Sequence, residues 1–306
     1  MKLHHFFAYG LEITSLIDLP VDLPNIGIAN HKIKLIYDNF GKRIKKNTLK
    51  YVTPITNVHN IPVQLSSNLP IHLEEYSSFR EWQLNIEEEI YFTWKGSIDE
   101  LHIEYFQNVN LKKLSFWLLH TVLPVYLILQ QKSYIFHASS IEYNNRAILF
   151  LAPSFGGKST LVDFFVEKGH KMISDDKLST YLDKGEFYAS PSYPYRRPYR
   201  KYEDLGIHSD LFTKKPLPIQ TFYLLNSVDM EKSISIESMG GLKKFEILKT
   251  SYLYDPISIT KRAVTYLMQI SKDIRMYQVN VPRDLLQLQD VYDCILKHEE
   301  NLGYSK

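Results

Sequence analysis

The sequence predicts an α/β protein in which a β-rich N-terminal domain precedes an α/β domain built around a phosphate-binding loop. Three observations support this fold class. Apolar and polar residues alternate in the strand manner through the first part of the chain, and strand-like and helix-like segments then take turns. In addition, Gly-Gly-Lys-Ser at 156–159 joins an apolar strand to an apolar helix. The predicted domains are residues 1–110 and residues 111–306.

Three segments of the first domain have the two-residue period of half-buried strands, at 32–37, 90–94 and 101–105. Turn-prone pieces lie between the strands, for example at 20–24, 57–60 and 95–97. This alternation predicts a domain made mainly of strands.

An apolar segment at 111–130 opens the second domain and predicts a buried helix. Its most apolar part, FWLLHTVLPVYLIL at 116–129, is shorter than the about 20 residues that a membrane span needs. It also contains His120 and Pro124, and the proline is expected to kink or interrupt the helix. We therefore expect no membrane partner.

The rest of the second domain alternates between the two kinds of element. The patterns predict strands at 134–143, 146–152, 170–174 and 220–226, and helices at 158–168, 241–253, 261–271 and 284–298. Gly169 stands where a helix C-terminus needs glycine, and Pro282 ends a strand before the last helix. Such alternation is typical of helices packed on a partly parallel sheet.

Composition excludes several classes of protein. The chain has 36 Lys and Arg residues against 34 Asp and Glu residues, a formal charge of +2, which is too balanced for a protein that coats nucleic acid. Cys294 is the only cysteine, so an internal disulfide or a multi-cysteine metal site is excluded. The first twenty residues have no sustained apolar run, and the expected compartment is the cytoplasm.

Residues 146–168 have the parts of a phosphate-binding loop. Such a loop needs glycines that admit unusual backbone angles, a helix N-terminus facing the anion, a lysine for the phosphates and a hydroxyl for Mg²⁺. The candidate nucleotide-binding residues are Ser154, Phe155, Gly156, Gly157, Lys158, Ser159 and Thr160. Ala152 stands where the strict pattern begins with glycine. The alternative is an ordinary tight turn between a strand and a helix.

Acidic and imidazole side chains accompany the loop. Asp175 and Asp176 follow a short apolar segment and are predicted to lie at the C-terminal end of its strand. There one carboxylate would bind Mg²⁺ and the other would accept the proton of an attacking hydroxyl. His137 lies in the strand before the loop strand, and its imidazole would contact a γ-phosphate or tune an aspartate. A turn at the aspartates and a buried histidine with a structural role are the alternatives.

Three segments in this order resemble the kinase core of the HPr kinase/phosphorylase family. They are His137-Ala138-Ser139, residues 152–161 and residues 169–176. The combination of these segments is most similar to the branch that phosphorylates ribosomally made peptides, notably the lasso-peptide kinases. Residues 7–13 with Leu19-Pro20 resemble the start of those proteins, and residues 277–284 resemble their last strand and helix.

The resemblance implies a phosphoenolpyruvate-carboxykinase-like fold and transfer of the ATP γ-phosphoryl group to a serine hydroxyl. It places Lys158 and the loop amides on phosphates, Ser159 with Asp175 and Asp176 on Mg²⁺, and His137 with both aspartates at the reacting centre. The implied cofactors are ATP and Mg²⁺, and either aspartate is a candidate for the base.

One segment departs from the family. HPr kinase/phosphorylases carry an Arg-Gly pair after the aspartates, and this chain has no such pair, which puts HPr as substrate and phosphorolysis in doubt. The segment 190–198 instead resembles a Pro-Ser-x-Pro-x-x-Arg stretch of the peptide-modifying branch, so Arg197 or Arg196 is a candidate to clamp a phosphate or a carboxylate. The alternative is a solvated basic loop. Arg200 and Arg283 have no assigned role.

The sequence thus predicts an ATP-dependent kinase whose partner is a peptide with an acceptor serine. The alternatives are a kinase of a small molecule such as free serine, and a protein that binds a nucleotide and transfers nothing. No oligomeric state is indicated.

Overall fold

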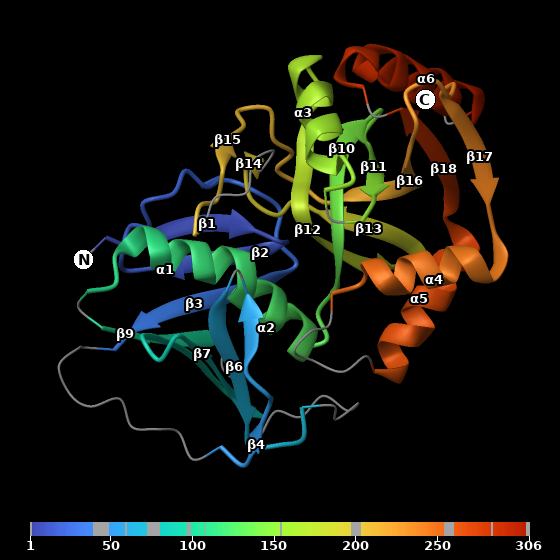
Figure 1. Ribbon diagram of the computed structural model, residues 1–306. Coiled ribbons are helices and arrows are strands. Elements are labelled where there is room, and N and C mark those ends of the chain that lie inside the picture. The colour runs from blue at the N-terminus through green and yellow to red at the C-terminus, as the bar shows by residue number, and fades with distance from the viewer. Residues whose placement is uncertain are drawn as a thin grey trace.

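The computed structural model describes residues 2–38, 49–58, 60–71, 80–96, 99–106, 108–153, 155–196, 203–253, 260–282 and 284–303. Four residues singled out above, Ser154, Arg197, Arg200 and Arg283, lie outside these ranges. The chain is a mixed α/β protein with two large sheets (Figure 1).

Strands of the first 105 residues form one sheet. Within the described ranges it has nine strands in the order β1-β2-β3-β9-β8-β7-β6-β4, with β5 paired to β6. Their bounds are β1 His4–Ala8, β2 Leu11–Ser15, β3 His31–Tyr37, β4 Tyr51–Val52, β5 Thr56–Val58, β6 Ile61–Ser67, β7 Glu81–Ile86, β8 Ile90–Lys95 and β9 Glu100–Tyr105. Burial alternates along β2 and β6, as the two-residue period requires. The strands predicted at 32–37, 90–94 and 101–105 are confirmed.

A long helix follows the first sheet and lies across it (Figure 1). It consists of α1 (Leu111–Trp117), the π-helical turn η1 (Leu118–Val122) and α2 (Leu123–Leu129). Asn110 caps its N-terminus by accepting a hydrogen bond from the Lys113 backbone N–H. Its buried residues join one hydrophobic core with those of the first sheet. The domain boundary at residue 110 therefore stays a prediction, since this helix packs with the strands that precede it.

The helix 111–129 would pass for a membrane span by length and composition alone, but 78% of its apolar window is buried inside the structure. The apolar face that such a helix would need for lipid is thus largely covered by the protein's own side chains.

The long strands after residue 133 form a second sheet. Within the described ranges its order is β11-β10-β12-β13-β16-β18-β17, and β16 also pairs with β11. Its strands are β10 Tyr134–Tyr143, β11 Arg146–Leu151, β12 Met172–Asp183, β13 Glu186–Ser190, β16 Leu217–Val228, β17 Ser235–Met239 and β18 Arg275–Pro282. The short strands β14 (Tyr195–Arg196) and β15 (Ile207–His208) pair with each other. Parallel pairing of β11 with β16 and of β16 with β18 agrees with the predicted partly parallel sheet.

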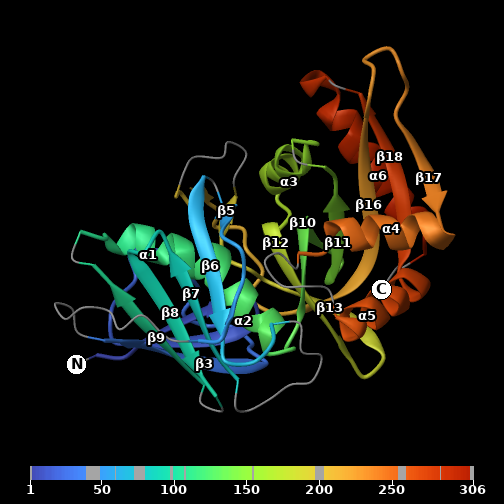
Figure 2. The same ribbon diagram turned by 60° about the horizontal axis from the view of Figure 1, so that its bottom comes forward.

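Helices cover both faces of this sheet (Figure 2). Buried residues of α3 (Lys158–Glu167) and α6 (Leu288–Asn301) share one core cluster with it. Those of α4 (Gly241–Ser251) and α5 (Lys261–Asp273) share another. A 3₁₀ turn, η2 (Leu285–Gln287), precedes α6. The four predicted helices are present, so the second half has the three-layer form that the alternating pattern indicates.

One predicted strand is wrong in extent. The segment predicted at 170–174 is the beginning of β12, which continues to Asp183. Asp175 and Asp176 therefore lie inside the strand, opposite Ser139 and Ala138 of β10, and not at its C-terminal end. The strand continues because Leu178 and Thr180 are buried and pair with β10, and the charged residues at 175–177 interrupt the apolar pattern that would have indicated this.

Candidate active site at the glycine loop

The loop between β11 and α3 is shaped by its two glycines. A Cβ at Gly156 would lie 2.6 Å from the Ala152 Cβ and 2.9 Å from the Pro153 carbonyl oxygen, so only glycine fits there. Gly157 has φ +89° and is the N-cap of α3. As a glycine it has no side chain to cap the first N–H groups of the helix, which are the groups that bind phosphate in such loops. These features fit a nucleotide phosphate better than an ordinary turn.

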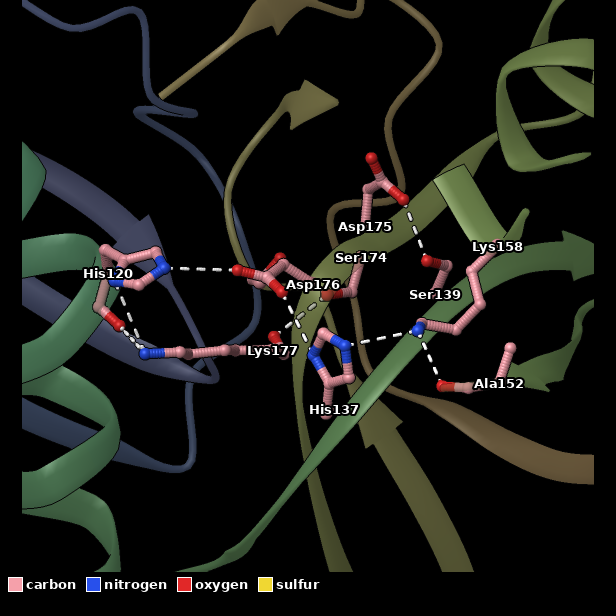
Figure 3. A network of polar contacts seen from close by, with 10 residues as sticks. His120, His137, Ser139, Ala152, Lys158, Ser174, Asp175, Asp176 and Lys177 are labelled. Atoms are coloured by element: carbon pink, nitrogen blue, oxygen red, sulfur yellow. Dashed lines mark hydrogen bonds and ion pairs between the residues drawn. The ribbon is translucent and has the colours of Figure 1, made fainter. Parts of the chain in front are cut away.

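Lys158 begins α3 and is buried with 6% of its surface exposed. Its Nζ donates to the Ala152 carbonyl oxygen at 2.9 Å and lies 3.1 Å from His137 Nε2 (Figure 3). The ammonium is therefore held across the mouth of the loop, between the loop backbone and β10. Because an ammonium has no acceptor, His137 Nε2 is the acceptor in this contact, and the ring proton sits on Nδ1.

Asp176 lies between two imidazoles. Its Oδ1 is 3.1 Å from His137 Nδ1, and its Oδ2 is 3.1 Å from His120 Nε2 (Figure 3). Burial raises the pKa of Asp176, but the hydrogen bonds from His120 and His137, with the charge of Lys177, outweigh this and hold the pKa well below its usual value. The carboxylate is thus an anion with a donor on each oxygen.

His120 belongs to the site but is not indicated by the sequence motifs. It belongs to η1, only 4% of its surface is exposed, and 56 positions separate it from Asp176. The one local signal is a histidine inside an otherwise apolar helix, which is costly unless the ring has a partner. No spacing rule names that partner, because the two residues meet only in the folded chain.

Asp175 has a different partner from Asp176. Its Oδ1 accepts a hydrogen bond from Ser139 Oγ at 2.8 Å. No group of three or more His, Cys, Asp and Glu side chains among the described residues is placed to hold a metal ion. Assignment of Ser159, Asp175 and Asp176 to Mg²⁺ stays a prediction.

The remaining predicted residues are less engaged with this network. Ser159 and Thr160 are partly exposed in the first turn of α3, and Phe155 is almost fully exposed at the loop tip with φ 62°. Arg196 forms an ion pair with Asp163 of α3, so its guanidinium lies against that helix. Of the arginines considered for an anion clamp, Arg196 alone lies within the described ranges.

A pocket of about 560 Å³ adjoins the loop. Its walls include Phe155, Gly156 and Thr160 on one side and apolar side chains of β16, β18 and α6 on the other, among them Leu225, Val281 and Leu288. A pocket of this size beside the loop, with both apolar and polar walls, has room for a nucleotide base.

Taken together, the loop, Lys158, His137 and Asp176 form one connected polar network from α3 to β12 (Figure 3). It places a cation, an oriented imidazole and a carboxylate beside a helix N-terminus. Such a set can neutralise phosphate charge and accept a proton from a hydroxyl.

No protein-family model matches this chain, and neither does any curated protein. The chain matches in part the solved structure of the Hpr(Ser) kinase/phosphatase from Coxiella burnetii, with 13% identity and a TM-score of 0.36. This match covers 55% of the present chain and 97% of that one.

Proposed function

We propose that this protein is a kinase with an HPr-kinase-like core that transfers the γ-phosphoryl group of ATP to a serine hydroxyl of a peptide. The observation that carries the proposal is the contact of Lys158 with His137, which is in turn hydrogen-bonded to Asp176. The residue that recognises phosphate and the pair that can accept a proton thus touch one another. Phosphoryl transfer needs this proximity, because positioning and charge neutralisation supply most of its catalysis.

In this proposal the loop amides and Lys158 bind the phosphates, and the pocket beside Phe155 takes the base. Ser159 and Asp175 would hold Mg²⁺, which would draw charge from the transferring group. His137 is oriented by Asp176 through its Nδ1–H, so that Nε2 faces the loop and can take a proton once the Lys158 ammonium donates to a bound phosphate instead.

Phosphoryl transfer then forms one bond to phosphorus, breaks another and moves one proton. The acceptor oxygen bonds to the γ-phosphorus as the bond from that phosphorus to the β–γ bridging oxygen breaks. ADP leaves with that electron pair, and the hydroxyl proton passes to the His137–Asp176 pair. This pair carries no net charge after the proton arrives, because the imidazolium is balanced by the Asp176 carboxylate.

A peptide acceptor is the part of the proposal that comes from the resemblance of residues 137–176 and 190–198 to peptide-modifying kinases. The C-terminal serine of a ribosomally made precursor peptide is the acceptor in that branch, and we propose the same class here. The β-rich first half would help to hold the peptide.

The test is incubation of the purified protein with γ-labelled ATP, Mg²⁺ and matched peptides that end in serine or in alanine. Label on the serine peptide alone, and its absence with Asp176→Asn, is the expected result. Label only on a small metabolite such as serine would instead identify a small-molecule kinase. ATP binding without labelling of any acceptor would overturn the proposal in favour of a nucleotide sensor.

A further inference from the structure

The histidine that bonds the outer oxygen of Asp176 comes from the N-terminal side of the molecule. His120 is carried by the helix 111–129, whose core residues pack with the first sheet, whereas Asp176 belongs to the second sheet. The hydrogen bond from Nε2 to Oδ2 at 3.1 Å therefore joins the two halves at the proposed reacting centre.

Backbone geometry explains how the ring comes to point there. Pro124, four residues after His120, has no N–H to donate to the His120 carbonyl, and its ring would collide with that carbonyl in a regular α-helix. The helix widens into a π-helical turn instead, in which the Leu123 N–H bonds the Leu118 oxygen. The His120 carbonyl oxygen accepts its hydrogen bond from Lys177 Nζ at 2.5 Å.

The ring itself is fixed on three sides. It stacks on Phe116 with centroids 4.9 Å apart and planes 12° from parallel. Its Nδ1 lies 3.2 Å from Thr121 Oγ1 and 3.4 Å from Lys177 Nζ. Since the lysine can only donate, Nδ1 is the acceptor and Nε2 carries the proton given to Asp176.

We propose that His120 and Lys177 act together as positioning residues for phosphoryl transfer: Lys177 fixes the π-helical turn, and His120 holds the second oxygen of Asp176 so that His137 stays aligned. This inference rests on the proposed kinase function. It adds a role for the helix that precedes the phosphate-binding core, and for the lysine directly after the aspartate pair. Neither residue touches the reacting atoms, so their effect passes through Asp176.

The test compares steady-state kinetics of His120→Phe, which keeps the stacked ring, with those of His120→Gln, whose amide N–H can replace Nε2–H. Removal of one hydrogen bond to a charged group predicts a fall in kcat of about 10- to 100-fold for the phenylalanine variant. KM for ATP should stay within about twofold of the wild-type value. The glutamine variant should recover most of the lost kcat.

Two further variants test whether the residues act as a unit. Lys177→Met should lower kcat in the same way, and the double variant with His120→Phe should be no slower than His120→Phe alone. His170→Phe is the matched control, because His170 Nε2 bonds Tyr292 Oη at 3.0 Å, outside the site, and kcat should not change.

The outcomes separate this inference from the function on which it rests. Full kcat in His120→Phe, with active wild-type protein, would refute the positioning role and leave the kinase function intact. A rise in KM with unchanged kcat would also refute it. Inactive wild-type protein would overturn both. Ring nitrogen spectra of the wild-type protein can be recorded without catalysis. They are expected to show the proton of His120 on Nε2, and a proton on Nδ1 would refute the proposed geometry.

Discussion

Replacement of Asp176 by asparagine tests the central feature of the site, a carboxylate that accepts a hydrogen bond from an imidazole on each oxygen. Asparagine has one acceptor oxygen and one donor nitrogen in the same space. Whichever imidazole faces the new nitrogen must move its proton to its other nitrogen, where a lysine ammonium already donates. For His137 that lysine is Lys158, and for His120 it is Lys177. One hydrogen bond of the chain is therefore lost in either orientation of the amide.

The loss of stability in Asp176→Asn can be estimated from the hydrogen bonds involved. A hydrogen bond to a charged group contributes about 1.5–3 kcal/mol, and Asp176 is buried, so water does not replace the lost partner. We expect Asp176→Asn to lower the free energy of unfolding by about this amount and to remove phosphoryl transfer. Nucleotide affinity should be kept, because the loop and Lys158 are unchanged.

Asp175→Asn is the matched control for stability. Its Oδ1 accepts a hydrogen bond from the Ser139 hydroxyl, which can turn to accept a bond from the new amide, so the change in this bond is expected to cost about 1 kcal/mol or less. Both variants are to be compared in urea titrations without nucleotide, since bound ligand would add its own stabilisation. If Asp176→Asn were no less stable than Asp175→Asn, or still transferred phosphate, the two-imidazole arrangement would be wrong.

Three other predictions concern the loop and the C-terminal helix. Lys158→Met should weaken ATP binding at least about tenfold by calorimetry, because a charge-assisted contact to phosphate is lost, and an unchanged Kd would contradict the assignment. Gly156→Ala should weaken it comparably, whereas Gly240→Ala, where a Cβ meets nothing within 4 Å, should bind ATP like the wild type. Burial raises the pKa of Glu299, while its hydrogen bonds to Tyr223, Thr221 and Gln220 lower it by less. A raised pKa stabilises the fold below the unfolded value of 4.5, and this is lost as pH rises through the folded pKa. The Tm of Glu299→Gln relative to wild type should therefore increase as pH rises from 4.5, and a constant difference would contradict this.

Local patterns were sufficient where an element is defined by its own residues. Strand β10 was predicted at its observed bounds, and the start of α3 at Lys158 follows from the glycines before it. The strand interior around Asp176 was predicted less well, because three consecutive charged residues have no apolar period, and their burial depends on partners from β10 and η1. Pairing across the sheet, and not propensity, keeps those residues in a strand.

The histidine at 120 shows why the remaining part of the site was not predictable. In the sequence His120 is a polar residue inside an apolar segment, and Pro124 indicates a break in the helix. Only in the folded chain do His120 and Pro124 act together. The proline removes a backbone donor, Lys177 supplies the missing hydrogen bond from another segment, and the widened turn directs the imidazole to the carboxylate beside that lysine. A polar residue in an apolar helix close to a proline is thus a signal worth testing against every buried charge of the neighbouring sheet, since burial without a partner would cost more than the fold can offset.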